Sequence, residues 1–396
     1  MNLSTLNYIT FNRPNTVGNE FFYMKQAITK RKLSGNGFFT NLCQTWLEKN
    51  LLCKKALLTP SCTSALELAA ILIDIKPGDE VIMPSFTFVS TANAFVLRGG
   101  VPVFVDIRLD TLNIDEQKIE EAITNKTKAI VPVHYAGVGC EMDTIMEMAH
   151  RFNLYVIEDA AQSIMSYYQN RPLGSIGHLA TFSFHETKNV TCGEGGALIL
   201  NNPKWVERAE IIREKGTNRS KFFRGEVNKY TWIDIGSSFL LSEINAAFLW
   251  AQLEKIDYIH ESRMKIWEHY HRGFEQLEKR GLVRRPIIPE KCRHNAHIYY
   301  LLVNDKETRD KLIKELKKSG IEAVFHYIPL HCSLAGKKFG RAVGDLSNTN
   351  FVSDRLIRLP IWVGMSEKQV NYVISQIYKI FETENLFLSS KLVDFS

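Results

Sequence analysis

The sequence lacks the apolar runs that mark membrane proteins. Within its 396 residues, no uninterrupted apolar stretch approaches the roughly 20 residues that a membrane-spanning helix needs. The chain also opens without a charged-then-apolar leader. We therefore expect a cytoplasmic protein with no membrane partner. No internal repeat or low-complexity tract is present, so a repeat architecture is not indicated.

Cysteine is scarce, and its spacing does not favour metal binding. The seven cysteines contain no Cys-x-x-Cys pair and are odd in number. Neither a metal cluster nor a disulfide framework is therefore indicated, and we expect reduced thiols. A Gly-x-Gly-x-x-Gly turn after an early strand is also absent, which argues against a nicotinamide-dependent oxidoreductase.

The chain has no large excess of charge of one sign. Its formal net charge of +6 comes from 49 Lys and Arg against 43 Asp and Glu, and the basic residues are interspersed with acidic ones. Because the basic residues form neither a tail nor a stripe, nucleic-acid binding is not indicated. A hydrophobic content of 45% allows a chain of this length to bury a large core, enough for two packed domains.

Apolar runs alternate with helical patterns from about residue 50 to 200. Helices are predicted around residues 115–123 and 143–152. Strands are predicted at residues 81–83, 101–105, 129–133, 155–157, 181–184 and 197–200. Such alternation predicts an α/β fold with a mostly parallel sheet.

The last third of the sequence has a different pattern. A long helical connector is predicted from residue 242 towards residue 280, and the final dozen residues carry no usable pattern and read as a frayed end. Beyond the connector, strands are predicted at residues 296–303 and 323–328, and helices at residues 307–318 and 366–380. We expect a large α/β domain over residues 1–260 and a smaller α+β domain over residues 261–396.

Lys188 and Asp159 follow two of the predicted strands. A buried parallel strand delivers the side chains beyond its end to a ligand crevice. Pyridoxal phosphate needs a lysine that holds it as a Schiff base and a carboxylate that faces its pyridine nitrogen. The pair therefore suggests an enzyme that uses this cofactor. Alone, each residue has a simpler reading, namely a solvated surface lysine and an aspartate in a turn.

A third element lies upstream of these residues. Apolar residues recur at helical spacing over residues 65–72, and Ser64-x-x-Glu67 reads as a capping box. The amino end of this helix would favour a phosphate, and the hydroxyls of Thr63 and Ser64 would add hydrogen bonds. An ordinary capped helix is the alternative. The glycine-rich residues 193–196 predict a tight turn that needs no ligand to explain it.

These segments, together with residues 84–93 and 131–137, resemble the DegT/StrS sugar-nucleotide aminotransferases. The likeness extends over most of the chain. It implies the fold of the fold-type I pyridoxal phosphate enzymes, with a large domain and a small C-terminal domain. It also implies pyridoxal 5'-phosphate as cofactor, with pyridoxamine 5'-phosphate as its intermediate form, and a homodimer.

The resemblance assigns roles to individual residues. Lys188 would hold the cofactor and move the proton, Asp159 would contact the ring nitrogen, and Gln162 would hydrogen-bond the phenolic oxygen. Phe88 would stack on the ring, with core packing as the alternative. The phosphate would contact the hydroxyls of Thr63, Ser64 and Ser183.

Other residues are expected to contact substrate or the second subunit. Many family members carry an asparagine after Gly236 that reaches the phosphate bound by the other subunit. Ser238 stands in this segment here and could donate a shorter hydrogen bond. The candidates for substrate binding are His185, Asn218, Arg219, His326 and His331. A solvated loop over residues 218–224 and structural histidines are the simpler readings.

Residues 184–189, 213–220, 234–239 and 324–331 are most similar to the family members that make TDP-4-amino-4,6-dideoxygalactose. The resemblance therefore implies transfer of an amino group from L-glutamate to C4 of a TDP-4-keto-6-deoxyhexose. The product would serve surface polysaccharide of the O-antigen or enterobacterial common antigen type. The gluco epimer and C3 amination of a 3-keto sugar are alternatives. A noncatalytic sensor or scaffold, and a sugar dehydratase with histidine in place of the lysine, are disfavoured because Lys188 is present.

Overall fold

The computed structural model describes residues 8–383, and its largest element is an 8-stranded sheet. In spatial order its strands are β1 (Lys55–Thr59), β9 (Gly196–Leu200), β8 (Leu179–Ser183), β5 (Tyr155–Asp159), β4 (Thr127–Ile130), β2 (Glu80–Pro84), β3 (Val101–Val105) and β14 (Arg341–Ala342). Strand β9 runs antiparallel to β1 and β8, and the remaining pairs are parallel. The carboxyl ends of the parallel strands therefore meet at one edge, which is where ligands bind in open α/β sheets.

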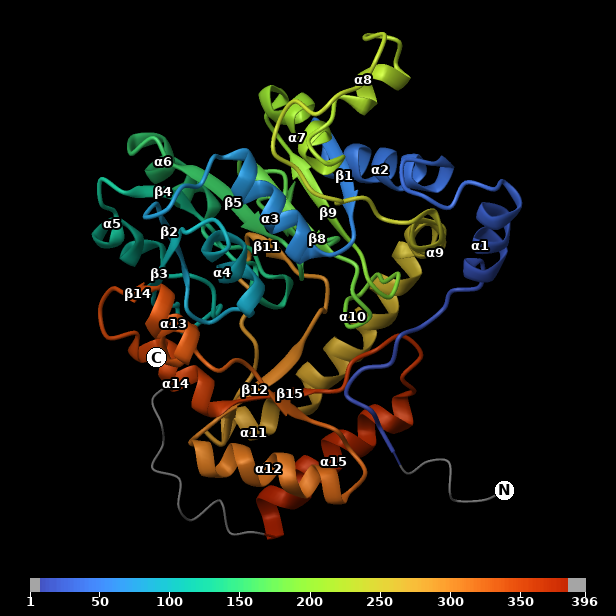
Figure 1. The fold of residues 1–396 in the computed structure, drawn as a ribbon. Helices are drawn as coiled ribbons and strands as arrows, with labels where there is room; N and C mark the ends of the chain where they lie inside the picture. The colour runs from blue at the N-terminus through green and yellow to red at the C-terminus, as the bar shows by residue number, and fades with distance from the viewer. Residues whose placement is uncertain (1–7, 384–396) are drawn as a thin grey trace.

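Helices cover both faces of the large sheet (Figure 1). One face packs against α3 (Cys62–Leu72), α4 (Val89–Val96) and α7 (Val206–Arg213). The other face packs against α2 (Phe38–Leu51), α9 (Glu243–Glu254), α5 (Ile119–Ala122) and α6 (Met142–Arg151). Because successive strand residues point to opposite faces, Leu198 and Ile199 of β9 enter different cores. Burial on both faces explains why the strands read as continuous apolar runs.

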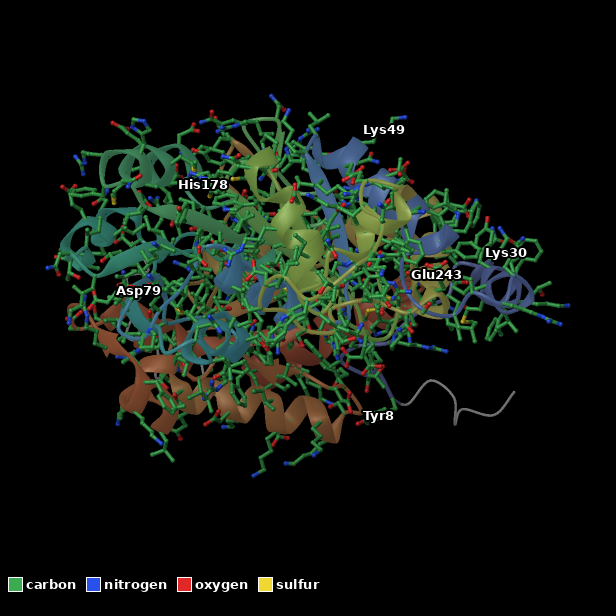
Figure 2. The ribbon with its side chains drawn as sticks, turned by 45° about the horizontal axis from the view of Figure 1, so that its top comes forward. Tyr8, Lys30, Lys49, Asp79, His178 and Glu243 are labelled. Carbon is green, nitrogen blue, oxygen red and sulfur yellow. The ribbon has the colours of Figure 1, made fainter. Side chains whose placement is uncertain are left out.

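The start of α2 depends on a residue far along the chain. Glu243 begins α9 and is buried (Figure 2). Its carboxylate accepts the backbone N–H groups of Gly37, Phe39 and Thr40 at 2.9–3.0 Å. A buried anion at a helix amino end is favoured by the free N–H groups and by the helix dipole. This contact fixes α2 against α9, and α1 (Glu20–Thr29) also packs on α9.

A second, antiparallel sheet lies in the C-terminal part of the chain. Its order is β10 (Val283–Arg284), β12 (Tyr299–Val303), β15 (Leu356–Leu359) and β13 (Val324–Phe325). Its core is shared with α10 (Ile256–Gly273), α11 (Glu275–Lys279), α12 (Lys306–Lys318) and α15 (Glu367–Thr383). Figure 1 shows this unit below the large sheet. The N-terminal segment joins it, because Ile9 N donates to Gly320 O at 2.7 Å and Glu322 N donates to Ile9 O at 2.9 Å.

Short elements complete the fold. A 3-stranded sheet contains β11 (Cys292–Arg293), β6 (Tyr167–Tyr168) and β7 (Arg171–Pro172). The remaining helices are η2 (Glu116–Lys118), η3 (Tyr135–Gly137), η4 (Pro203–Trp205), α8 (Arg219–Phe223), η5 (Leu330–Cys332), α13 (Leu334–Phe339) and α14 (Ser347–Arg355). Among residues 8–383, no helix is long and apolar enough to cross a membrane, and no group of side chains is arranged to hold a metal ion.

The predicted α/β fold is confirmed, and its boundaries need two corrections. The long connector is three helices: α9 and α10, which meet at Lys255, and α11, which follows α10 after Phe274. The strand predicted at residues 323–328 is regular only over Val324–Phe325. Strand β1, with its antiparallel pairing to β9, was not predicted. The division after residue 260 remains a prediction, and the final dozen residues lie outside the described residues.

Candidate active site

Asp159 lies at the carboxyl end of β5, where it is buried. Its Oδ2 accepts from Thr91 Oγ1 at 2.8 Å, and its Oδ1 accepts from Ala161 N at 3.2 Å. Thr91 belongs to α4, so the carboxylate of Asp159 links the end of β5 to this helix. Burial raises the pKa of Asp159, although the bonds from Thr91 and Ala161 and the charge of Lys188 oppose this shift.

Lys188 lies in the loop that joins β8 to β9. Backbone bonds from Phe184 N to Gly195 O and from Glu186 N to Gly193 O close this loop. Gly193 has a φ of +82°, which favours glycine. Desolvation lowers the pKa of the Lys188 amine, although the charges of Cys62 and Asp159 oppose the shift. The amine and the carboxylate of Asp159 therefore lie near enough to act on each other.

The predicted capping box at Ser64 and Glu67 is wrong. Helix α3 begins at Cys62, and its N-cap is Ser61, whose Oγ accepts from Ser64 N at 3.0 Å. Ser61 has an extended backbone, so its side chain can turn back over the first turn. Thr63 lies in that turn, and its hydroxyl donates to Ser90 Oγ at 2.8 Å. The start of α3 therefore contacts α4, which is the helix that carries Thr91.

The start of β9 approaches the start of α3 closely. A Cβ built on Gly196 would lie 2.3 Å from the carbonyl carbon of Ser61. Only glycine fits between the two backbones. Cys62 lies near enough for the charges of Asp159 and Lys188 to act on its thiol, whose pKa is raised by burial. The amino end of α3 thus lies near Asp159 and Lys188.

Gln162, Phe88 and Ser183 are the remaining residues that the sequence predicts to contact the cofactor. Gln162 is buried, its Oε1 accepts from Ala136 N at 2.7 Å, and its Nε2 donates to Tyr327 Oη at 3.2 Å. Phe88 is the N-cap residue of α4 and is 58% exposed, which excludes core packing within one chain. Ser183 ends β8 and is buried.

The predicted histidines have partners within the protein. His326 is buried, and its Nδ1 lies 3.0 Å from Tyr135 Oη. His331 Nδ1 lies 2.6 Å from Ser85 Oγ. Burial lowers the pKa of both imidazoles, so they are neutral at pH 7. His185 is partly exposed, and its Nδ1 lies 2.9 Å from Thr187 Oγ1.

Asn218, Arg219 and Ser238 are not brought to Lys188 within one chain. Asn218 precedes α8, and its Oδ1 accepts from Thr231 N at 2.8 Å. Arg219 lies 4.0 Å from Glu214. Figure 1 shows α8 standing out from the upper end of the molecule. Ser238 is exposed and forms an isolated bridge with Glu214. The contacts of these three residues therefore lie around α8 and Glu214, and none of them involves Lys188 or Asp159 among the described residues.

Several contacting residues escaped the sequence analysis. Thr91 lies inside the segment 84–93 that carried the resemblance, but no local pattern marks its bond to Asp159. Tyr327 follows His326 and reaches Gln162 from the C-terminal part of the chain. Asn189, next to Lys188, is held by His297 Nδ1 at 2.8 Å from its Oδ1. These contacts join residues that are far apart in sequence, so spacing could not reveal them.

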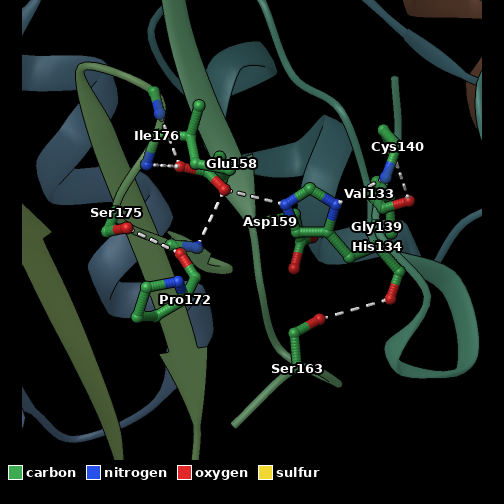
Figure 3. Close-up of polar contacts among 12 residues, drawn as sticks. Val133, His134, Gly139, Cys140, Glu158, Asp159, Ser163, Pro172, Ser175 and Ile176 are labelled. Atoms are coloured by element: carbon green, nitrogen blue, oxygen red, sulfur yellow. Dashed lines mark hydrogen bonds and ion pairs between the residues drawn. The ribbon is translucent and has the colours of Figure 1, made fainter. Parts of the chain in front are cut away.

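A buried hydrogen bond between a glutamate and a histidine lies behind Asp159, on the opposite face of β5 (Figure 3). Glu158 and His134 are fully buried, and Glu158 Oε2 lies 2.9 Å from His134 Nε2. Cys140 N donates to His134 Nδ1 at 3.2 Å, which assigns the imidazole proton to Nε2. Glu158 also accepts the N–H groups of Gly174, Ile176 and Gly177 at 2.6–2.8 Å.

These contacts set the charge of Glu158 and fix the end of the strand. Burial alone would raise the pKa of its carboxyl, but the bond and charge from His134 and the backbone donors lower it below 4.5. The carboxylate is therefore ionised in the folded protein at neutral pH.

Comparison with known proteins identifies the family. The profile of the DegT/DnrJ/EryC1/StrS aminotransferase family matches residues 18–378. The chain belongs to this family. It is 40% identical over 334 residues to the uncharacterised protein MJ1066 of Methanocaldococcus jannaschii, covering 83% of this chain and 86% of that protein. It is 36% identical over 335 residues to the spore coat polysaccharide biosynthesis protein SpsC of Bacillus subtilis, covering 83% and 85%.

Solved structures agree with the family assignment. Spr1654 from Streptococcus pneumoniae, which is named as a sugar aminotransferase, matches in its PMP-form with a TM-score of 0.88. The two sequences are 26% identical, and the match covers 97% of this chain and 100% of that one. The fold is that of the fold-type I enzymes, and the chain is a sugar aminotransferase that uses pyridoxal 5'-phosphate.

The described residues fit this cofactor. A carboxylate has about four acceptor positions, and Asp159 uses one towards Thr91 and one towards Ala161, which leaves capacity for a ring N–H. Lys188 offers an amine with no carboxylate bound to it among the described residues. The hydroxyls at the start of α3 suit a phosphate. The exposed ring of Phe88 is free to stack on an aromatic group.

Glu158→Gln should destabilise the protein strongly. The new amide NH2 cannot accept, so two of the N–H donors around it lose their partner in a buried site, at a cost of about 3 kcal/mol. Urea unfolding at pH 7 measures this cost. Since the folded pKa of Glu158 lies below 4.5, the difference between wild type and variant should shrink as the pH falls below 4.5. A difference in unfolding free energy that stays constant from pH 7 to pH 3 would contradict the ionised state assigned to Glu158.

Proposed function

We propose that this enzyme transfers an amino group from L-glutamate to C4 of a TDP-4-keto-6-deoxyhexose. The product is TDP-4-amino-4,6-dideoxy-D-galactose, which is used for surface polysaccharide of the O-antigen or enterobacterial common antigen type. The observation that carries the proposal is the mutual electrostatic influence of Lys188, Asp159 and Cys62, the first residue of α3, which supports a common site. The relative SpsC is named as a spore coat polysaccharide biosynthesis protein, which supports a sugar destined for the cell surface.

In this proposal Lys188 moves the proton. The bound cofactor supplies a ring that withdraws electrons from the carbon that loses its proton. Because desolvation lowers the pKa of Lys188, more of its amine is neutral at pH 7, and only the neutral Nζ can accept a proton. The same Nζ then returns the proton at the adjacent position. Transfer to the keto sugar uses these steps in reverse.

Asp159 keeps the cofactor ring charged. Its ionised carboxylate would accept the ring N–H through a charge-assisted bond in a site shielded from water. The bond from Thr91 favours the ionised carboxylate that this role needs, against the opposing effect of burial. Gln162 is held by Ala136 and Tyr327 and would orient the phenolic oxygen. Phe88 would stack on the ring, and the phosphate would contact Thr63, Ser64 and Ser183.

We also propose that the active enzyme is a homodimer. The segment around α8 exposes large apolar side chains, including Phe223 (69%) and Trp232 (78%). Apolar surface of this kind on a protruding segment favours contact with a second protein surface. A second copy would bring Ser238, Asn218 and Arg219 to the neighbouring cofactor and substrate. His185, His326 and His331 would contact the substrate from the same chain as Lys188.

Sedimentation should therefore give twice the chain mass. Trp232→Ser removes a large apolar contact, so the dimer should dissociate at higher protein concentrations, by a factor of about 10 to 100. Tyr258→Ser, at an exposed position on α10, is the matched control and should sediment as wild type. A fully active monomer would refute the cross-subunit roles of Ser238 and Arg219.

Lys188→Ala should abolish catalysis. Removing the base is expected to lower the transamination rate by at least 100- to 10,000-fold, and the visible absorbance of the bound cofactor should shift because its covalent link to the chain is lost. Stopped assays and absorbance spectra of the cofactor-loaded protein measure both effects. Lys204→Ala changes an exposed lysine in η4, after β9, and should leave both the transamination rate and the absorbance unchanged. Equal activity of wild type and Lys188→Ala would overturn the assignment.

The product decides between the sugar alternatives. We expect the enzyme, incubated with L-glutamate and TDP-4-keto-6-deoxyglucose, to give one amino sugar. Proton NMR should show the small H3–H4 coupling of an axial C4 amine, as in the galacto product. A large coupling would establish the gluco epimer instead. Turnover only with a 3-keto sugar nucleotide would show that C3 is the aminated carbon.

A further inference from the structure

Asn189, the residue after Lys188, is held by a segment from the C-terminal part of the chain. Its side chain is buried, and its Nδ2 donates to Asn295 O at 2.8 Å. Its Oδ1 lies 2.8 Å from Nδ1 of His297, which is also buried. Both partners come just before β12, which enters the second sheet. One amide therefore ties the loop of Lys188 to the segment that leads into the smaller sheet.

These two bonds determine which nitrogen of His297 carries the proton. The Asn295 carbonyl can only accept, so the amide nitrogen of Asn189 faces it and the amide oxygen faces the imidazole. An amide oxygen also only accepts, which assigns the proton to Nδ1 of His297. Burial above all, and then the positive charge of Lys188, lower the pKa of His297, so the ring is neutral at pH 7. His297 is therefore a neutral donor, fixed on the residue next to Lys188.

The segment that carries His297 is itself held in place. Asn295 Nδ2 donates to the carbonyl oxygens of Gln162 and Ile164, each at 2.8 Å. Arg263 of α10 is buried and donates to His297 O at 2.8 Å. Gln162 is the residue expected to contact the phenolic oxygen of the cofactor. The same short segment thus contacts the backbone of Gln162 and the neighbour of Lys188, so it sets their relative position.

Two other asparagines hold this loop at points further from the lysine. Asn12 Nδ2 donates to Glu186 O at 3.1 Å, and Asn245 Nδ2 donates to Cys192 O at 2.9 Å. A lysine side chain is a flexible stem, so the reach of its amine depends on where its backbone is held. Asn189 holds the adjoining peptide unit, and a displacement of about 1 Å in a reacting group can cost about 100-fold in rate.

We propose that His297 is a positioning residue for the transamination: through its bond to Asn189 it fixes the backbone of Lys188, so that the amine reaches both positions of proton transfer. This inference rests on the proposed function, since it takes Lys188 as the base of that reaction. His297 acts through Asn189 and not on the substrate. Because one amine serves both half-reactions, loss of the bond should slow both to a similar extent and leave substrate affinity unchanged.

His297→Phe removes the donor and keeps an aromatic ring. Enzyme loaded with pyridoxal phosphate is mixed with L-glutamate, and enzyme loaded with pyridoxamine phosphate is mixed with the keto sugar nucleotide. We expect the rate at saturating substrate to fall about 10- to 100-fold in both half-reactions. The concentration of each substrate for half-maximal rate should change less than about twofold. Glutamate deuterated at its α-carbon should slow the variant more than the wild type, because proton transfer becomes rate-limiting.

His297→Asn and Asn189→Ala test the route of the effect. His297→Asn puts an amide N–H near the place of Nδ1, so it should recover most of the lost rate. Asn189→Ala should slow both half-reactions as His297→Phe does. The double variant should be no slower than Asn189→Ala alone, since both changes break one contact. Asn189→Ala also carries the test if His297→Phe does not fold.

Asn201→Ala is the matched control. Asn201 follows β9, at the opposite end of this strand from the loop of Lys188. Its Nδ2 donates to two backbone carbonyls, Gly174 O at 3.1 Å and Gly177 O at 2.8 Å. The variant loses a comparable pair of bonds, so it should lose stability and keep the rates of both half-reactions. Melting temperatures measure the loss of stability in each variant.

Formation of the covalent link between cofactor and chain gives a readout without substrate. Pyridoxal phosphate added to the cofactor-free protein should link to Lys188 more slowly in His297→Phe than in wild type, as followed by absorbance. Unchanged rates of linking and of both half-reactions in His297→Phe and Asn189→Ala would overturn the inference, even if both variants are less stable. A change confined to the half-maximal concentrations would also overturn it. Wild type that links the cofactor but converts neither substrate would contradict the proposed function, and the rate of linking would still test His297.

Discussion

The opposed effects of burial on one carboxylate and one amine are the constraint on which the site depends. Asp159 is buried and Lys188 is half-buried, and this desolvation raises the pKa of Asp159 and lowers that of Lys188. Each charge partly counteracts the shift of the other, and Thr91 adds a hydrogen bond that favours the ionised carboxylate. Proton transfer on pyridoxal phosphate needs a neutral amine and an ionised carboxylate; desolvation favours the first, and the bond from Thr91 favours the second.

The parallel sheet brings these groups together. Asp159 ends β5 and the loop of Lys188 follows β8, and these strands are direct neighbours. Glu158, one residue earlier, faces the opposite side of the sheet and is fixed by His134 and by backbone donors. Alternation along one strand therefore gives adjacent carboxylates different tasks. One holds the backbone in place and the other is presented to the ligand.

The sequence predicted the features that depend on local pattern. Apolar runs located the central strands because burial on both faces leaves a continuous signal, and the order of Asp159 and Lys188 placed both at one edge. The start of α3 was misplaced because Ser61 and Ser64 both suit a helix start, and only backbone geometry separates the cap from the first turn. The contacts of Thr91, Tyr327 and Asn189 join distant segments. No spacing rule records such contacts, because packing of the two sheets creates them.

The N-terminal segment spans both parts of the molecule within a few residues. Ile9 pairs with the strand-like backbone at Ile321 and Glu322, while Asn12 holds the carbonyl of Glu186. Any movement of the smaller sheet relative to the larger one would also displace this short N-terminal segment. Loss or displacement of this short N-terminal segment would therefore remove contacts from the C-terminal sheet and from the loop of Lys188 at the same time.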